Sequence, residues 1–182
     1  MFKRFDDSSV SGTTQLKSSV QKGIRNKIVE QYPAIEEYID EILPKKESLK
    51  IVKCSNRIEI LINEKGEHLF FHDRDEPYMP SLKLIHKYPT ICPLMQVDSG
   101  AIQFVLQGAN IMCPGLTSKG AIMTPNLFPG TIVTIIAQGK QHALAVGVMK
   151  MSTGEIGSIN KGVAVENIHY LNDGLWRLKP IR

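Results

Sequence analysis

The sequence lacks the features of an exported or membrane-spanning protein. No apolar run approaches the ~20 residues that cross a bilayer, and the opening residues, MFKRFDD, contain no apolar core typical of a secretory signal. Cysteine is scarce, and the three residues Cys54, Cys92 and Cys113 are odd in number, far apart and form no CxxC pair. Such a pattern is typical of reduced thiols in a cytosolic protein. We therefore expect a cytoplasmic protein.

The sequence also lacks the common catalytic motifs. The patterns GxxxxGK[ST], GxGxxG and GxSxG are all absent. A catalytic cysteine needs a neighbouring base and a lowered pKa, but Cys113 lies in the apolar run NIMCP with no His, Lys or Arg within four positions. We interpret Cys113 as an inert, buried thiol and predict that the protein is not an enzyme.

Metal-ligand spacing is missing as well. The five histidines and three cysteines form no paired ligand motif. His68 and His72 flank a strand-like LFF and would share one face, which we expect to be exposed. The acids of HDRDEP are typical of a solvated turn, and Asp173 in NDG is typical of turn chemistry. We predict no metal site and no cofactor.

Length and charge describe an ordinary globular protein of one large or two small domains. The chain has 182 residues, 42% hydrophobic and 22% charged, with a net charge of +4, which permits a polyanionic partner without requiring one. Residues 1–92 carry 15 Lys and Arg against 14 Asp and Glu (+1), whereas residues 93–182 carry 7 against 4 (+3). This shift, with the prolines of HKYPTICP, predicts two domains, 1–92 and 93–182.

Periodicity predicts an α+β first domain. Apolar residues recur every four positions from Leu16 to Ile28 and the pattern stops before Pro33, which indicates an amphipathic helix, and a second helical signal follows over 34–43. Three strands and a short helix are then expected at 49–54, 57–63, 67–73 and 80–88, with Pro80 in the first turn of that helix.

The second domain begins with a helix signal and continues as short strands. The helix is expected over 97–108, capped by Asp98 and closed by Gly108. The strands are expected at 110–113, 130–138, 142–152, 162–170 and 175–179. Their β-branched content and glycine punctuation predict a small closed or nearly closed β-barrel, with Lys140 exposed in the hairpin GKQ.

Several long segments resemble known proteins. VDSGAIQFVLQGANIMCPGL, GTIVTIIAQGKQHALAVGVMKMS and INKGVAVENIHY resemble a PUA domain, with one departure at Pro129-Gly130-Thr131, where many PUA domains have Gly-Asp. Together with MFKRF, LPKK, HLFF, HKYP and ENIHYLNDGLW, they are similar to the malignant T-cell amplified sequence family over essentially the whole chain. The resemblance implies a small α+β (pre-PUA) domain followed by a PUA RNA-binding domain.

The resemblance also implies a function and partners. Members are translation factors of the small ribosomal subunit that form a heterodimer with the density-regulated protein, which carries a SUI-type domain; ligatin combines equivalent modules in one chain. The pair is implicated in non-standard initiation, reinitiation, and post-termination release of deacylated tRNA during ribosome recycling. We therefore expect a density-regulated protein homologue, small-subunit rRNA and tRNA as partners.

Site residues follow by analogy with PUA domains, in which the first helix and the glycine-rich turn-strand after it form an RNA-facing groove. The RNA-binding candidates are Gly108, Asn110, Met112, Pro114, Gly115, Lys119 and Lys140. Lys22 and Arg25, which share a helix face in the first domain, are candidates for ribosome contact.

Phe104 is the candidate for binding the protein partner. A helical projection gathers Ala101, Ile102, Val105 and Leu106 into one arc, and Phe104 falls roughly 130° from its centre. Two interpretations stay open. Phe104 packs against the first domain, or it is an exposed aromatic anchor for the partner.

One rival class uses the same domain. PUA domains are often appended to pseudouridine synthases and transglycosylases, so the chain could be the RNA-targeting subunit of an RNA-modifying enzyme. Residues 1–92 are too short for such a catalytic domain and contain no recognisable catalytic motif. A structural ribosome-associated protein would differ from a factor mainly in its stoichiometry.

Overall fold

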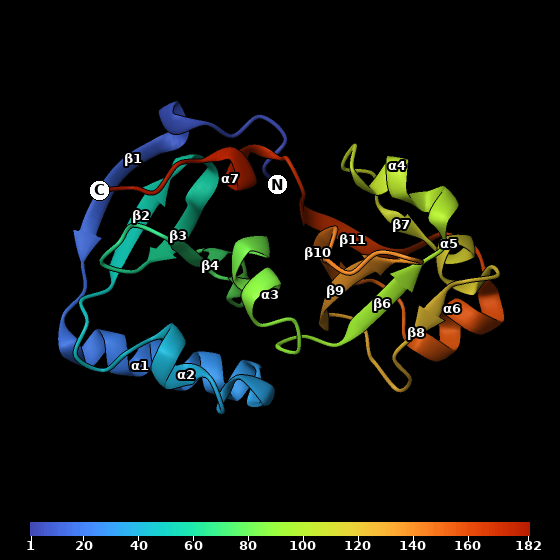
Figure 1. The fold of residues 1–182 in the computed structure, drawn as a ribbon, viewed down its shortest axis with the longest axis horizontal. Helices are drawn as coiled ribbons and strands as arrows, with labels where there is room; N and C mark the ends of the chain where they lie inside the picture. The colour runs from blue at the N-terminus through green and yellow to red at the C-terminus, as the bar shows by residue number, and fades with distance from the viewer. The chain divides into compact units, whose positions relative to one another are not determined.

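The computed structural model describes residues 1–182 and divides into two compact units (Figure 1). The N-terminal unit comprises Phe5–Ile91 with Arg177–Arg182, and the C-terminal unit comprises Met1–Arg4 with Cys92–Trp176. The division of the sequence into domains 1–92 and 93–182 stays a prediction. No helix combines the length and apolarity that a membrane span requires.

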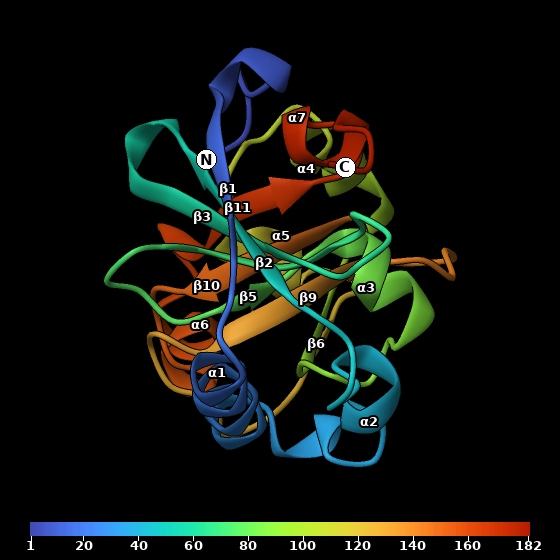
Figure 2. The same cartoon turned by 90° about the vertical axis from the view of Figure 1, so that its left-hand side faces the viewer.

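The N-terminal unit is an antiparallel sheet with helices along one side of it (Figures 1 and 2). The five strands follow the order β1-β2-β3-β4-β5. The strands are β1 (Val10–Gln15), β2 (Lys50–Cys54), β3 (Ile58–Ile62), β4 (His68–Asp73) and β5 (Met79–Pro80). The helices are η1 (Asp7–Ser9), α1 (Ser18–Gln31), η2 (Pro33–Ile35), α2 (Ile39–Ile42), η3 (Ser55–Arg57) and α3 (Leu82–Lys87). Buried side chains of β2, β3 and β4 form the core together with buried side chains of the helices, among them Ile28, Ile35 and Leu82.

The expected strands at 49–54, 57–63 and 67–73 are confirmed as β2, β3 and β4, whereas the helix predictions were less accurate. Residues 10–15 form β1, so α1 begins only at Ser18, and of its apolar residues Ile28 alone is buried. Pro80 belongs to β5, and Ser81 instead caps α3 by accepting a hydrogen bond from the Leu84 amide at 3.2 Å.

The prediction that His68 and His72 are exposed was wrong, because both are buried. β4 is an interior strand whose residues 68–72 are all buried, so other parts of the unit cover both of its faces and neither face is exposed. The His72 ring stacks on Tyr78 with centroids 4.1 Å apart, and its Nε2 lies 3.3 Å from a carboxylate oxygen of Glu59. These contacts give His72 a structural role.

The C-terminal unit is a curled six-stranded sheet with the order β7-β11-β10-β9-β6-β8. Its strands are β6 (Leu94–Val97), β7 (Ile111–Met112), β8 (Ile122–Met123), β9 (Ile132–Ala137), β10 (Ala145–Met149) and β11 (Val163–Tyr170). Its helices are η4 (Ser99–Ala101), α4 (Ile102–Val105), α5 (Cys113–Thr117), α6 (Thr153–Ile159) and α7 (Gly174–Arg177). All pairings are antiparallel except that of β6 with β9.

The end of the chain departs from prediction. The strand expected over 175–179 is instead the short helix α7. Asp173 does more than shape a turn, because its buried carboxylate accepts hydrogen bonds from the Tyr170 and Trp176 amides and lies 2.7 Å from Nδ1 of His169. The His169 ring meets Phe2 edge-on, with centroids 5.6 Å apart, so this network also holds the N-terminus of the chain.

Candidate RNA and partner interface

The candidate site is built around Asp98. Its carboxylate caps the η4–α4 segment by accepting from the Ala101 amide at 3.0 Å, and it also accepts from the Ser118 hydroxyl. The Asp98 amide donates to the carbonyl of Gly115 in α5 at 3.1 Å. One residue therefore joins the start of η4 to α5, and the space between these segments is the site.

A groove of about 580 Å³ lies between α4, β7 and α5. Its lining residues are mostly apolar or small: Asp98, Gly100, Ala101, Phe104, Val105, Ala109, Asn110, Ile111, Met112, Pro114, Gly115 and Ser118. Phe104 is 54% exposed and Met112 is 47% exposed, so both offer large apolar surfaces to a ligand. Exposed apolar surface around a concavity is typical of an interaction site.

The structure brings together most of the residues that the sequence assigned to two different ligands. Phe104, predicted to bind the partner protein, lines the same groove as four RNA-binding candidates. These four are Asn110, Met112, Pro114 and Gly115. The predicted helix is shorter than expected, and Leu106, placed on its packed face by the projection, is 38% exposed.

Two glycines of this region serve different purposes. Gly108 does not line the groove. Glycine is required there for two reasons: its φ is +87°, and an added Cβ would lie 2.8 Å from the Tyr170 ring. At Gly115 an added Cβ would lie 3.7 Å from the Ala101 Cβ, an ordinary contact. Glycine at 115 therefore keeps the groove open without being demanded by backbone conformation.

Asn167, which sequence reasoning missed, holds the groove wall from behind. Its buried side-chain amide donates to the carbonyls of Val105 and Ala109 at 3.1 and 3.0 Å. Its backbone amide donates to the Asn110 side chain at 3.0 Å. Because the Asn110 side-chain oxygen accepts this bond, the groove gains a fixed edge between α4 and β7. An isolated asparagine within a strand run was the only signal in the sequence.

No lysine, arginine or histidine side chain lines the groove. Asp98 is the only charged residue of its lining, and the basic candidates lie outside it. Lys119 follows Ser118 on an exposed segment, and Lys140 is exposed in the connection between β9 and β10. That connection spans residues 138–144, longer than the tight GKQ hairpin predicted.

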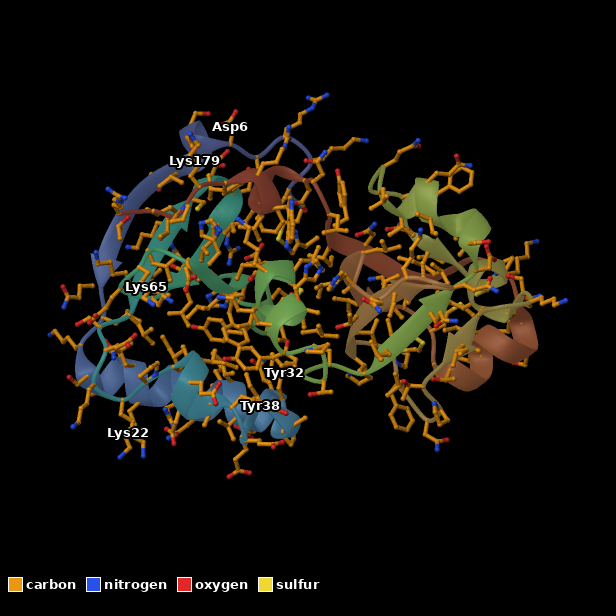
Figure 3. The ribbon with its side chains drawn as sticks, in the orientation of Figure 1. Asp6, Lys22, Tyr32, Tyr38, Lys65 and Lys179 are labelled. Carbon is orange, nitrogen blue, oxygen red and sulfur yellow. The ribbon has the colours of Figure 1, made fainter.

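The two ribosome-contact candidates lie by a second groove of about 850 Å³, in the N-terminal unit between α1 and α2. Arg25 pairs with Asp40, holding the pKa of that carboxyl below its usual value, and it also donates to the Leu43 carbonyl. Its side chain is only 15% exposed, so Arg25 joins α1 to α2. Lys22 is exposed and projects outward from α1 (Figure 3).

The three thiols are buried. Burial raises the pKa of Cys92 to about 12 and that of Cys54 to about 11, which disfavours the nucleophilic thiolate. Cys113 begins α5 and is fully buried, with its sulfur 3.5 Å from both Met151 Sδ and the Lys161 carbonyl oxygen. No group of three or more His, Cys, Asp or Glu side chains is arranged to hold a metal ion.

We expect Cys113→Ala to destabilise the protein by about 1 kcal/mol, the cost of a small buried group, and to leave RNA and partner binding intact. Urea unfolding followed by fluorescence of Trp176, the single tryptophan, measures the first effect. A folded Cys113→Ala protein that no longer binds its partners would contradict the inert-thiol interpretation.

Comparison with known proteins identifies both units. Residues 5–89 match the Pre-PUA-like domain and residues 93–171 match the PUA domain, so the chain is a pre-PUA and PUA protein. Solved structures of a hypothetical protein from Pyrococcus horikoshii and a conserved PUA domain protein from Thermoplasma acidophilum share this fold. Their TM-scores are 0.74 and 0.67 at 23% and 22% identity, each covering 91% of this chain and 98% of its own.

Full-length relatives define the family. The chain is 58% identical to malignant T-cell-amplified sequence 2 of Homo sapiens and 56% identical to a malignant T-cell-amplified sequence 1 homolog of Drosophila melanogaster. It is 49% identical to translation machinery-associated protein 20 of Eremothecium gossypii. Each match covers 100% of both chains. The chain therefore belongs to the malignant T-cell-amplified sequence family.

Proposed function

We propose that the protein is a non-catalytic, cytoplasmic translation factor that binds RNA of the small ribosomal subunit and tRNA. In this proposal it acts as a heterodimer with a density-regulated (SUI-domain) protein, in non-standard initiation, reinitiation and post-termination tRNA release during ribosome recycling. The observation that carries the proposal is the full-length identity to relatives of which one is named for association with the translation machinery. The PUA domain supports RNA as a ligand.

The charges around the groove suggest which groups of RNA or of the partner protein contact each part of the site. A phosphate entering the groove would meet no cation and one carboxylate, that of Asp98. We therefore assign phosphate contacts to Lys119 and Lys140, outside the groove. The apolar groove walls suit an uncharged group, either an apolar side chain of the partner protein at Phe104 or an unstacked base of RNA.

Capture of the tagged chain from cytosolic extract tests the proposal. We expect a SUI-domain protein and small-subunit rRNA to co-purify, and the rRNA to be lost first as salt rises, because phosphate contacts release counterions. Sedimentation should show substoichiometric association with free small subunits. Absence of both the SUI-domain protein and small-subunit rRNA from the captured material would overturn the proposed function.

We expect charge reversal at the basic candidates to weaken RNA binding without unfolding the protein. Lys140→Glu, Lys119→Glu and Lys22→Glu should each reduce affinity. Each should also lower the slope of log affinity against log salt by about 0.7–0.9 for every phosphate that the variant no longer neutralises. Fluorescence anisotropy with labelled small-subunit rRNA fragments measures both the affinity and the slope.

Lys65→Glu is the matched control, because Lys65 lies in the turn between β3 and β4 and belongs to neither groove (Figure 3). It changes the net charge equally, so it should leave the slope unchanged. Unchanged salt slopes in all three candidate variants would remove these lysines from the RNA contact. Arg25 is unsuitable for this test because its reversal would also break the contacts with Asp40 and Leu43.

A further inference from the structure

β1 leaves one edge of the N-terminal sheet without a neighbouring strand. The strand order begins at β1, which pairs only with β2. Figure 1 shows β1 as the outermost strand of its sheet, and in Figure 2 it crosses the face of this unit nearest the viewer. Five of its six residues are exposed, so side-chain burial contributes little to holding it in place.

This edge has few of the features with which proteins block strand addition. Residues 10–15, VSGTTQ, include no charged residue and no proline. A bulge interrupts the pairing between Val10 and Gly12, but the register is regular from Gly12 to Gln15. The regular part is therefore an uncharged edge that is open to another strand.

The ladder shows which backbone groups face outward. The Leu16 amide donates to the Leu49 carbonyl at 2.9 Å, so Leu16 and Leu49 form a hydrogen-bonded pair. In an antiparallel ladder such pairs alternate with pairs whose N–H and C=O groups point away. By this alternation the N–H and C=O groups of Thr14 point toward β2, whereas those of Thr13 and Gln15 point away from β2, out from the edge of the sheet.

Cations flank the open edge. Residues 10–17 and 48–54 contain Lys17, Lys50 and Lys53 and no acidic residue. Lys50 pairs with Gln15 and Lys53 pairs with Gly12, and because side chains alternate along a strand, these two lysines lie on opposite faces of the sheet. Each face next to the edge therefore carries one lysine.

The acid that lies opposite Lys53 in the sheet is already engaged by other side chains. Glu59 of β3 lies opposite Lys53. One of its carboxylate oxygens lies 3.5 Å from Nε of Arg74 and the other 3.3 Å from Nε2 of His72. The charge of Lys53 is thus available to a ligand.

We propose that residues 13–15 take an extended, acidic segment of a partner protein as an added strand. The outward N–H and C=O groups of Thr13 and Gln15 supply main-chain hydrogen bonds, and the flanking lysines select acidic side chains on either face. Two copies of β1 would bring lysines together with no acid to meet them, which disfavours self-pairing. RNA offers no peptide backbone to continue the ladder.

Amide exchange measured by NMR on the full-length protein tests this proposal. The probe is a mixture of fluorescein-labelled decapeptides in which Glu alternates with Val or Thr. One control mixture has Lys in place of Glu, and another keeps the acidic composition but has Pro at the centre. We expect the first mixture to slow exchange of the Thr13 and Gln15 amides at least tenfold and leave Thr14 unchanged.

Variants separate backbone pairing from charge. Thr13→Pro removes an outward N–H while the ladder to β2 keeps its bonds, so it should abolish binding of the acidic peptides. Should that variant unfold, the double variant Lys50→Glu, Lys53→Glu keeps the backbone and should weaken binding at least tenfold.

Three results would overturn the proposal. One is no protection of Thr13 and Gln15 by the acidic peptides. Another is equal binding of the lysine or proline-interrupted mixtures. The third is protection that rises with protein concentration in the absence of peptide, because it would mean that the edge pairs with a second copy.

Discussion

Phe104→Asp should abolish capture of the proposed SUI-domain partner and leave the stability of the protein nearly unchanged. Phe104 is 54% exposed, so its replacement removes little packing from the core. A central aromatic anchor of an interface contributes about 2 kcal/mol or more, so affinity should fall at least roughly thirtyfold. Pull-down from extract and urea unfolding followed by Trp176 fluorescence measure the two effects.

Phe128→Asp is the matched control. Phe128 is 71% exposed in the same unit, but it does not line the groove. The same chemical change there should leave partner capture intact. A large loss of stability in Phe104→Asp would instead support a packing role, and full capture of the partner would remove Phe104 from the interface. Loss of RNA with the partner retained would assign the groove to a base.

The groove could be predicted in part because its parts are close together in sequence. Asp98 caps the segment that it was predicted to cap, since a capping signal depends on only a few neighbouring residues. Gly108 was recognised as a helix terminator, and its φ of +87° is the reason. That Phe104 and Met112 share one groove could not be predicted, because it depends on how β7 pairs with β11.

The missed features depend on contacts distant in sequence. β1 carries no alternation of buried and exposed residues, since nearly all of it is exposed, so its strand character comes from pairing with β2. His68 and His72 are buried because distant segments cover both faces of β4, as the stacking of Tyr78 on the His72 ring illustrates. Asn167 supports a wall that lies almost 60 positions earlier in the chain. Periodicity carries no information on such pairings.

The largest loss of stability is expected at Asp173. Its carboxylate is buried and accepts from the Tyr170 amide at 3.0 Å and the Trp176 amide at 2.9 Å, beside His169 at 2.7 Å. Removing one member of a buried polar network costs about 3 kcal/mol or more, because the other members lose a partner that water does not replace. Asp173→Ala should therefore lower the melting temperature by roughly 6–12 °C.

Asp75→Ala is the control that shows the effect of removing a carboxylate from the surface. This substitution breaks the pair between Asp75 and Arg57, which is exposed. The two side chains are 74% and 58% exposed, and such a pair contributes at most about 1 kcal/mol. Asp173→Asn keeps one oxygen that can accept a hydrogen bond from a backbone amide. Its loss of stability should therefore lie between those of Asp173→Ala and Asp75→Ala. Trp176 fluorescence reports unfolding next to Asp173, and near-UV circular dichroism follows both units. If Asp173→Ala were no less stable than Asp75→Ala, the buried network would not be what joins Phe2, His169 and α7.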